Sequence, residues 1–186
     1  MSVEATSAAV LRMTEEEFLA RYADERPSYE FVNGEVTQKP MTKRSHFLVA
    51  GEIAAALRAY RRAGARGLSG EDPTVNISAG GDRRYRAPDV AYWSPGKAGH
   101  GEILGPPTLA VEILSPGQTL STMPAKCREY RSRGVEACWL VNPYRRTVEV
   151  FDEARDGEPL TGDLLECPAL PGFQLPLAEL FAPLDE

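Results

Sequence analysis

Alternating and helical patterns of hydrophobic positions divide the chain into short strands and helices. Thr14 followed by Glu17 is a capping-box pattern, which predicts a helix over 14–23. Asn33-Gly34 lies between two strand-like runs, 29–32 and 35–38, and predicts a hairpin. From residue 42 the apolar residues recur at helical spacing, which predicts a long helix that ends at Gly64. Its expected apolar stripe is Phe47, Leu48, Ile53, Ala54, Leu57 and Tyr60.

The second half of the chain is richer in strand-like runs. We expect strands in PTVNI, YRAPDVAYW, TLAVEIL, EACWLVN and TVEVFD, a loop in SPGKAGHGEILGPP, and helices at 126–133 and 177–181. This order predicts an α/β (α+β) fold, a mixed β-sheet flanked by helices. The 186 residues contain no obvious linker, so we expect one domain at 13–186 after a poorly ordered segment, 1–12.

Composition and charge narrow the class of protein. Apolar residues make up 42% and charged residues 26%, as in ordinary globular domains. No apolar run approaches the ~20 residues that span a bilayer, and the start lacks a signal-peptide pattern, so we expect a cytoplasmic protein without membrane contact. A formal net charge of −6 argues against a protein that coats nucleic acid non-specifically. Cys127, Cys138 and Cys167 have no zinc-ligand spacing, so reduced thiols in or near the core are expected.

One carboxylate interrupts a strand that otherwise reads as buried. In TLAVEILSP, alternation places Leu109, Val111 and Ile113 on one face and Glu112 on the other, between Ala110 and Leu114. An unpaired buried carboxylate costs several kcal/mol, so such a group is normally exposed, paired, protonated or metal-bound. An exposed position on a half-buried strand and a functional position remain equally open at this point.

A second acid, Asp89, precedes another apolar run, 23 positions before Glu112. Pro88-Asp89 alone is also a common turn. If the two strands are neighbours, their carboxylates converge, and no matching cation lies nearby in the sequence. Converging carboxylates then indicate a hard divalent cation, Mg²⁺ or Mn²⁺.

Other residues complete this candidate site, each with an ordinary alternative. Lys126 lies in the first turn of an expected helix, where the helix dipole disfavours a cation, and Tyr130 follows one turn later. Glu30 occupies a strand position that an exposed edge would also accommodate.

His46, near the start of the long helix, is a candidate for contact with phosphate or metal-bound water, or a packing residue. Arg86 closes a basic run, Arg83-Arg84-Tyr85-Arg86, that leads to Asp89 and would suit phosphate contacts.

These segments together resemble the Uma-two family of bacterial proteins, within the PD-(D/E)XK nuclease superfamily. The matching segments extend over residues 13–181 and are MTEEEFLA, YEFVNGEV, SHFLVAGEIAAAL, APDVAYWSP, GPPTLAVEILSPGQT, KCREYRSRGVEACWLVNP, TVEVF and LPGFQLPLAELF. Each motif is weak alone, but their order and spacing are specific. The resemblance implies a restriction-endonuclease-like sheet and a metal site of Asp89 and Glu112, with Glu30 as a further acid.

The resemblance also implies a Mg²⁺-dependent endonuclease that hydrolyses DNA. The plain superfamily motif places a lysine two positions after Glu112, where this chain has Leu114, so the lysine's role passes to Lys126. The alternative is a catalytically inactive module of the same fold that binds DNA or acts in assembly. A homodimer, with an interface near TVEVF, is a further expectation.

Overall fold

The computed structural model describes residues 11–115 and 122–186. Its helices are α1 (Glu15–Arg21), α2 (Arg44–Arg62), α3 (Met123–Ser132), α4 (Leu177–Phe181) and the 3₁₀ helix η1 (Ala182–Asp185). Its strands are β1 (Leu11–Arg12), β2 (Tyr29–Val32), β3 (Glu35–Gln38), β4 (Leu68–Glu71), β5 (Val75–Asn76), β6 (Arg84–Arg86), β7 (Val90–Trp93), β8 (Leu109–Ile113), β9 (Ala137–Asn142), β10 (Thr147–Phe151), β11 (Asp156–Pro159), β12 (Leu164–Glu166) and β13 (Gln174–Pro176).

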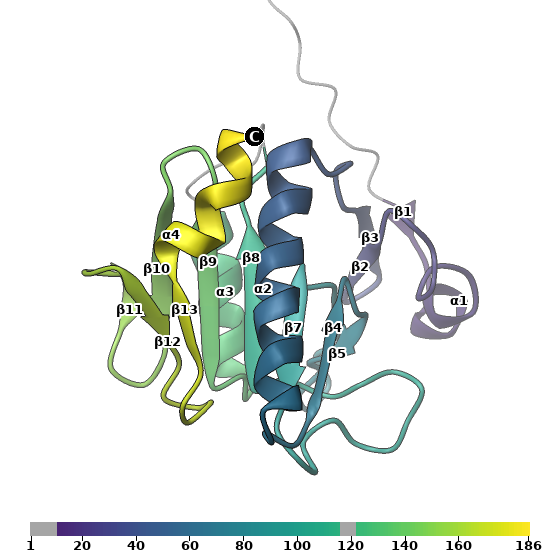
Figure 1. Cartoon of the computed structure of the whole chain (residues 1–186). Helices are drawn as coiled ribbons and strands as arrows, with labels where there is room; N and C mark the ends of the chain where they lie inside the picture. The colour runs from purple at the N-terminus through teal and green to yellow at the C-terminus, as the bar shows by residue number, and fades with distance from the viewer. Residues whose placement is uncertain (1–10, 116–121) are drawn as a thin grey trace, which may run out of the picture.

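A mixed six-stranded sheet forms the centre of the molecule. Its strand order is β11-β10-β9-β8-β7-β4, and β8 and β9 are parallel while the other pairs are antiparallel. Helices α2 and α4 cover one face, and α3 covers the other (Figure 1). This architecture confirms the predicted α/β (α+β) class.

Strand β8 lies in the middle of this sheet with both of its faces buried. Leu109, Val111 and Ile113 pack into the core under α2, whereas Ala110 and Leu114 pack into the core under α3. The predicted alternation is therefore correct. Because the second face is covered by a helix, the exposed position considered for Glu112 is wrong: the residue is 1% exposed.

A second sheet, in the order β1-β3-β2-β6-β5, lies beside the first. The β2–β3 hairpin pairs as predicted, with Val32 opposite Glu35 across the Asn33-Gly34 turn. Phe18 of α1 packs against Phe31 and Tyr85 of this sheet, with ring centroids 5.3 Å and 5.6 Å apart. This small core fixes β2 and β6, which carry two charged residues of the candidate site described below.

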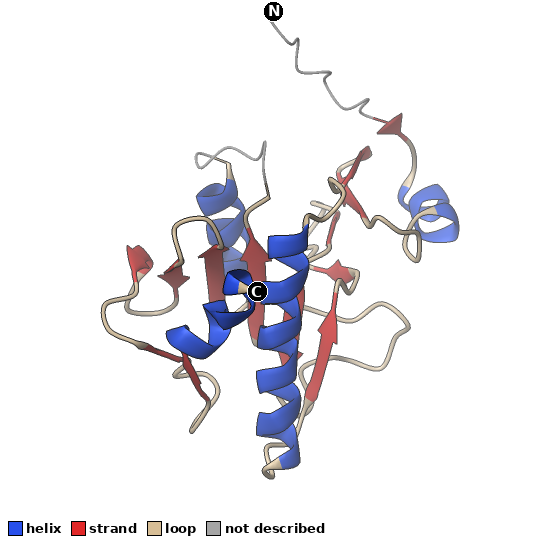
Figure 2. Cartoon of the chain, turned by 45° about the horizontal axis from the view of Figure 1, so that its top comes forward, coloured by secondary structure: helices blue, strands red, loops and turns tan. Residues whose placement is uncertain are grey.

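The N-terminal ends of α2 and α3 lie on opposite sides of the central sheet but at the same end of it (Figure 2). The end of β8 and the start of β7 lie at that end too (Figure 1). Residues from four separate segments of the sequence can therefore meet there.

Several local predictions are wrong. Phe47 is 70% exposed, because His46 and Val49 take the buried positions at the start of α2. Helix α3 begins at Met123 rather than at residue 126, and the sequence analysis missed β4, β11, β12 and β13. Residues 1–10 of the segment expected to be poorly ordered lie outside the described residues, while 11–12 form β1.

The structure also bears on the membrane, thiol and interface expectations. No helix in the described part of the chain is long and apolar enough to cross a membrane. All three cysteines are free and buried, as predicted. Strand β10 lies between β9 and β11 with its apolar side chains in the core, so TVEVF is not an exposed dimer interface.

Candidate active site

Asp89 immediately precedes β7 and Glu112 lies in β8, and these two strands are neighbours, as the sequence analysis required. β7 and β8 are antiparallel, with Val90 opposite Val111. The backbone N–H of Asp89 donates to the carbonyl of Val111 at 2.9 Å, and the N–H of Ile113 donates to Asp89 Oδ2 at 2.6 Å. The Asp89 side chain is thus fixed beside the backbone of the residue that follows Glu112.

Two basic side chains contact the buried Asp89 carboxylate. Lys39 Nζ lies 2.6 Å from Oδ1, and His46 Nε2 lies 3.1 Å from Oδ2. Burial alone would raise the pKa of Asp89, but Lys39 and His46 lower it well below its ordinary value. Asp89 is therefore ionised at neutral pH, and His46 contacts this carboxylate from the first turn of α2.

Lys39 is the site residue that the sequence analysis missed. Its ammonium contacts Asp89, donates to the carbonyl of Ala87 at 2.7 Å and lies 3.2 Å from Asp72 Oδ1. Burial would lower the pKa of Lys39, but Asp89, Glu112 and Asp72 raise it, so the group stays charged. In the sequence it is one of several basic residues before α2, and no local pattern separates it from Lys43.

The negative charge of Glu112 is balanced by a lysine of α3. Lys126 Nζ lies 2.8 Å from Glu112 Oε1, and the Tyr130 hydroxyl donates to the same oxygen at 2.9 Å. Burial raises the pKa of Glu112, Lys126 opposes this effect, and the charge of Asp89 adds to it; the net shift is upward. The Asp89 and Glu112 charges are thus close enough to repel each other.

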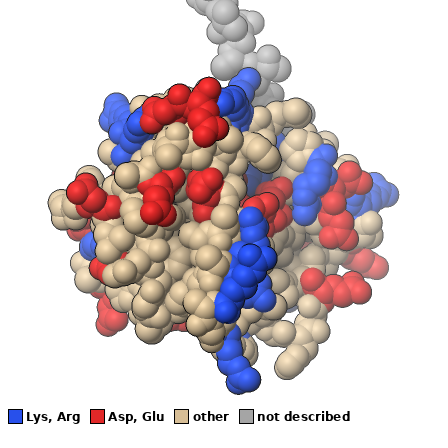
Figure 3. Space-filling model, in the orientation of Figure 1, with Lys and Arg blue, Asp and Glu red and all other residues tan. Residues whose placement is uncertain are grey.

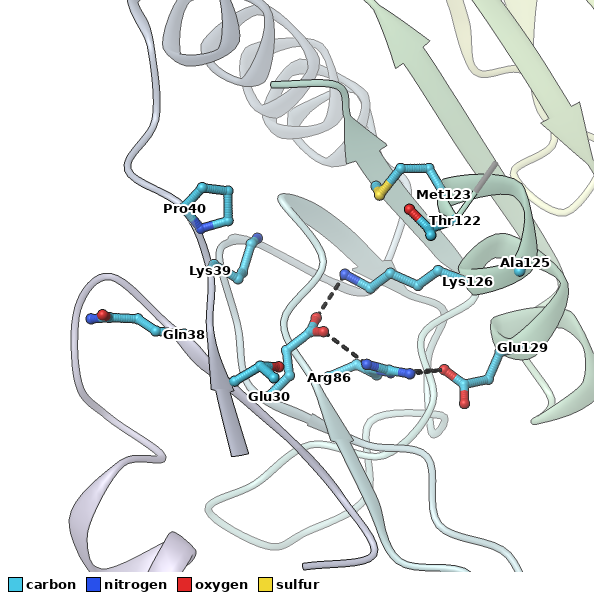
Figure 4. A pocket seen from close by; sticks show the side chains of 11 residues that line it. Glu30, Gln38, Lys39, Pro40, Arg86, Thr122, Met123, Ala125, Lys126 and Glu129 are labelled. Atoms are coloured by element: carbon cyan, nitrogen blue, oxygen red, sulfur yellow. Dashed lines mark hydrogen bonds and ion pairs between the residues drawn. The ribbon is translucent and has the colours of Figure 1, made fainter. Parts of the chain in front are cut away.

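Glu30 joins the same group of charges from β2. Its Oε1 lies 2.7 Å from Lys126 Nζ and accepts from the Ala87 N–H at 3.1 Å, while Oε2 lies 2.9 Å from Arg86 Nη1. Burial would raise its pKa, but Lys126 and Arg86 lower it to about 2. Lys126 therefore bridges Glu30 and Glu112, and Figure 4 shows its side chain reaching over to Glu30.

Tyr130 and Arg86 contact the buried acids of the site rather than solvent. Tyr130 is fully buried, and Lys126 Nζ lies 5.9 Å from the centre of its ring. Arg86 also pairs with Glu129 at 2.6 Å (Figure 4). Arg84 is also paired, with Asp82 and Glu129. Neither arginine is therefore the free phosphate ligand that the basic run before Asp89 was expected to offer.

Two cavities open beside the site. One, of about 430 Å³, is lined by Glu30, Arg86, Lys126 and Glu129. The other, of about 790 Å³, is lined by Asp89 and His46 and by the exposed side chains of Met41 and Phe47, among others. Lys39 and Pro40 line both cavities, so this short segment stands between the two entrances.

Both acids therefore have matching cations in the fold, although none lies nearby in the sequence. Lys39 neutralises Asp89 and Lys126 neutralises Glu112, although both lysines are distant from their partners in sequence. Within residues 11–115 and 122–186, no group of three or more His, Cys, Asp or Glu side chains is arranged to hold a metal ion. Glu112 thus interrupts its strand with an internal lysine as its counter-ion.

The carboxylate oxygens of Asp89 and Glu112 are nevertheless of the type that a hard divalent cation binds. Mg²⁺ prefers carboxylate oxygens and keeps several waters, so two protein carboxylates suffice. Asp89 and Glu112 supply them from adjoining strands, and Asp89 opens onto the larger cavity.

Basic side chains also gather away from these acids. In Figure 3 Lys and Arg side chains form a patch over the lower part of α2. Arg58, Arg61, Arg62 and Arg66 line a shallow cavity there of about 420 Å³. An overall acidic chain can therefore still present a local basic surface to an anionic partner.

Comparisons with known proteins agree with the fold. Residues 15–178 match the Uma2 family model, which is described as "Putative restriction endonuclease". A solved structure from Anabaena variabilis, described as a putative nuclease belonging to DUF820, is similar with a TM-score of 0.77 and 22% sequence identity. The match covers 91% of this chain and 98% of that one. No curated protein matches the chain significantly.

Proposed function

This chain belongs to the Uma2 family, and we propose that it is a divalent-metal-dependent endonuclease that hydrolyses DNA phosphodiester bonds. The observation that supports this most is the position of Asp89 and Glu112 at the same end of the neighbouring strands β7 and β8. Lys126 contacts Glu112, and two cavities, one lined by Lys126 and the other by Asp89, open beside them. A buried group of acids with shifted pKa values in a hollow is typical of a functional site.

Each residue has a role in this proposal. Asp89 and Glu112 would hold Mg²⁺ or Mn²⁺, which supplies an activated water and stabilises negative charge on the phosphate. Lys126, charged because Glu112 and Glu30 raise its pKa against the effect of burial, would donate to the scissile phosphate or the attacking water. Glu30 fixes the Lys126 ammonium, and His46 orients the Asp89 carboxylate.

The test is cleavage of supercoiled plasmid and of oligonucleotides with Mg²⁺ or Mn²⁺. We expect nicking by the wild type and at least a hundredfold loss in Asp89→Asn, Glu112→Gln and Lys126→Met, as for removal of a charge-stabilising group. Glu35→Gln is the matched control, because Glu35 is an exposed acid on β3 that pairs with Arg12 and lines neither cavity. Wild-type nicking rates in a folded Asp89→Asn or Glu112→Gln protein would refute the assigned roles.

One observation favours the alternative, a catalytically inactive module that binds DNA or acts in assembly. Lys39 and Lys126 already neutralise the two acids, so the fold needs no metal ion for charge balance. For such a module, Mg²⁺ and Mn²⁺ would leave the melting temperature unchanged and no substrate would be cut. The basic patch of Arg58, Arg61, Arg62 and Arg66 would bind the DNA backbone in either case. A homodimer and a cytoplasmic location stay predictions.

A further inference from the structure

We propose that Lys39 is a built-in cation that competes with the divalent metal ion for Asp89 and thereby sets the protein's metal affinity. The proposal rests on the proposed function, because it takes Asp89 to be a metal ligand. It assigns to Lys39 a role separate from that of Lys126, which is the lysine paired with Glu112.

The surroundings of the Lys39 ammonium are those of a cation site. Three oxygens contact it: Asp89 Oδ1 at 2.6 Å, the Ala87 carbonyl at 2.7 Å and Asp72 Oδ1 at 3.2 Å. Carboxylate and backbone carbonyl oxygens are also the ligands that hard divalent cations take in proteins. The ammonium therefore lies where an ion that binds Asp89 Oδ1 would need to lie.

Asp72 and Ala87 can keep part of this environment when Lys39 leaves Asp89. The Asp72 carboxylate is fixed by the Ser28 hydroxyl, which donates to Oδ2 at 2.5 Å. The backbone N–H of Asp72 donates to the Asp89 carbonyl at 2.9 Å, so the two acids are held together through the main chain as well. Lys39 can thus release Asp89 and remain paired with Asp72.

Lys39 also lies on a segment that can accommodate such a shift. Residues 39–43 connect β3 to α2 without regular structure. The side chain borders both cavities, so displacement of its ammonium from Asp89 has open space on either side. By contrast, Lys126 projects from a helix and bridges two buried acids, Glu30 and Glu112, which hold it in place.

The proposed competition determines whether metal affinity rises or falls when Lys39 is changed. Two cations at one carboxylate repel each other, so a metal ion that binds Asp89 must displace Lys39 or tolerate its charge. Removing the charge of Lys39 removes this opposition. Among the basic side chains that the structure describes, only His46 then contacts Asp89. Metal affinity should therefore rise when Lys39 is neutralised, although the residue is next to a proposed metal ligand.

The experiment is a calorimetric titration of the full chain with Mn²⁺, without DNA. We expect Lys39→Met to bind Mn²⁺ at least tenfold more tightly than the wild type, a gain of about 1.4 kcal/mol. Lys39→Arg, which keeps the charge, should bind like the wild type. Lys43→Met is the matched control, because Lys43 is an exposed lysine on the same segment that caps α2 without a side-chain hydrogen bond. It should change the affinity less than about twofold.

Each outcome has a clear consequence. Unchanged or weaker Mn²⁺ binding by folded Lys39→Met would overturn the competition while leaving the nuclease proposal intact. Asp89→Asn should abolish Mn²⁺ binding. If neither the wild type nor Lys39→Met shows such Asp89-dependent binding, both the competition and the metal-dependent function are refuted. Melting curves check the fold, and should Lys39→Met fail to fold, Lys39→Gln removes the charge but keeps a hydrogen-bond donor toward Asp89.

Discussion

The pairing of Glu30 allows a quantitative prediction about stability. In the folded protein Lys126 and Arg86 offset the effect of burial and lower the pKa of Glu30 from 4.5 to about 2. A difference of this size corresponds to about 3 kcal/mol of folding free energy, because each pKa unit is about 1.4 kcal/mol. Since the folded pKa is lowered, this contribution is present above pH 4.5 and is lost as the pH falls toward 2.

The perturbation is Glu30→Gln, which keeps the shape of the side chain and removes its charge. Urea unfolding at about pH 7 should show a loss of about 3 kcal/mol, and the difference from wild type should shrink as the pH falls below about 4.5. The control is Glu35→Gln, because Glu35 lies on the neighbouring strand in an exposed pair with Arg12 and should matter by less than about 1 kcal/mol. A Glu30→Gln effect that is equal at about pH 7 and about pH 3 would refute the reasoning.

Further predictions concern the buried acid Glu112, its partner Tyr130 and two glycines. Because the pKa of Glu112 is raised, mainly by burial, Glu112→Gln should melt higher than wild type at about pH 8, and this gain should shrink toward about pH 4; a lower melting temperature at both values would contradict it. Tyr130→Phe removes the hydrogen bond to Glu112 and should cost about 2 kcal/mol in urea unfolding, whereas no loss would mean that this bond contributes nothing. Gly67→Ala should cost more than about 2 kcal/mol, because a Cβ there would lie 2.3 Å from the Trp93 carbonyl at a φ of +147°. Gly51→Ala, inside α2 with open space around the new Cβ, should instead stabilise by about 0.5–1 kcal/mol; equal effects at the two glycines would refute this comparison.

Local patterns in the sequence predicted the elements that local chemistry determines. The Thr14 capping box and the Asn33-Gly34 turn both form as expected, because each depends on residues within a few positions. The alternation in β8 correctly separated its two faces, since that period is a property of the extended chain. The tail strands β12 and β13 escaped prediction because their runs are only three residues long.

The charge balance of the site could not be predicted in the same way. Lys39 and Asp89 are 50 positions apart, and their contact depends on how β3 and the start of α2 pack against β7. Sequence reasoning identified the acids because a carboxylate in an apolar strand is anomalous in any fold. A lysine in a polar connection is not anomalous, so its partner becomes visible only in three dimensions.

The proposed function gives these internal ion pairs a physical meaning. A site that must bind a metal ion needs acids that stay buried and stable before the ion arrives. Lys39 and Lys126 meet that need, and they differ in how firmly they are held. We therefore expect Lys126 to remain at the site in the loaded protein and Lys39 to withdraw from Asp89.

The most direct measurement is a crystal structure of the protein soaked in Mn²⁺, with the ion located by anomalous scattering. We predict one strong peak in contact with the carboxylates of Asp89 and Glu112, together with the ammonium of Lys39 moved away from Asp89. A structure at saturating Mn²⁺ that has no peak at these acids, and in which both lysine pairs are intact, would contradict it.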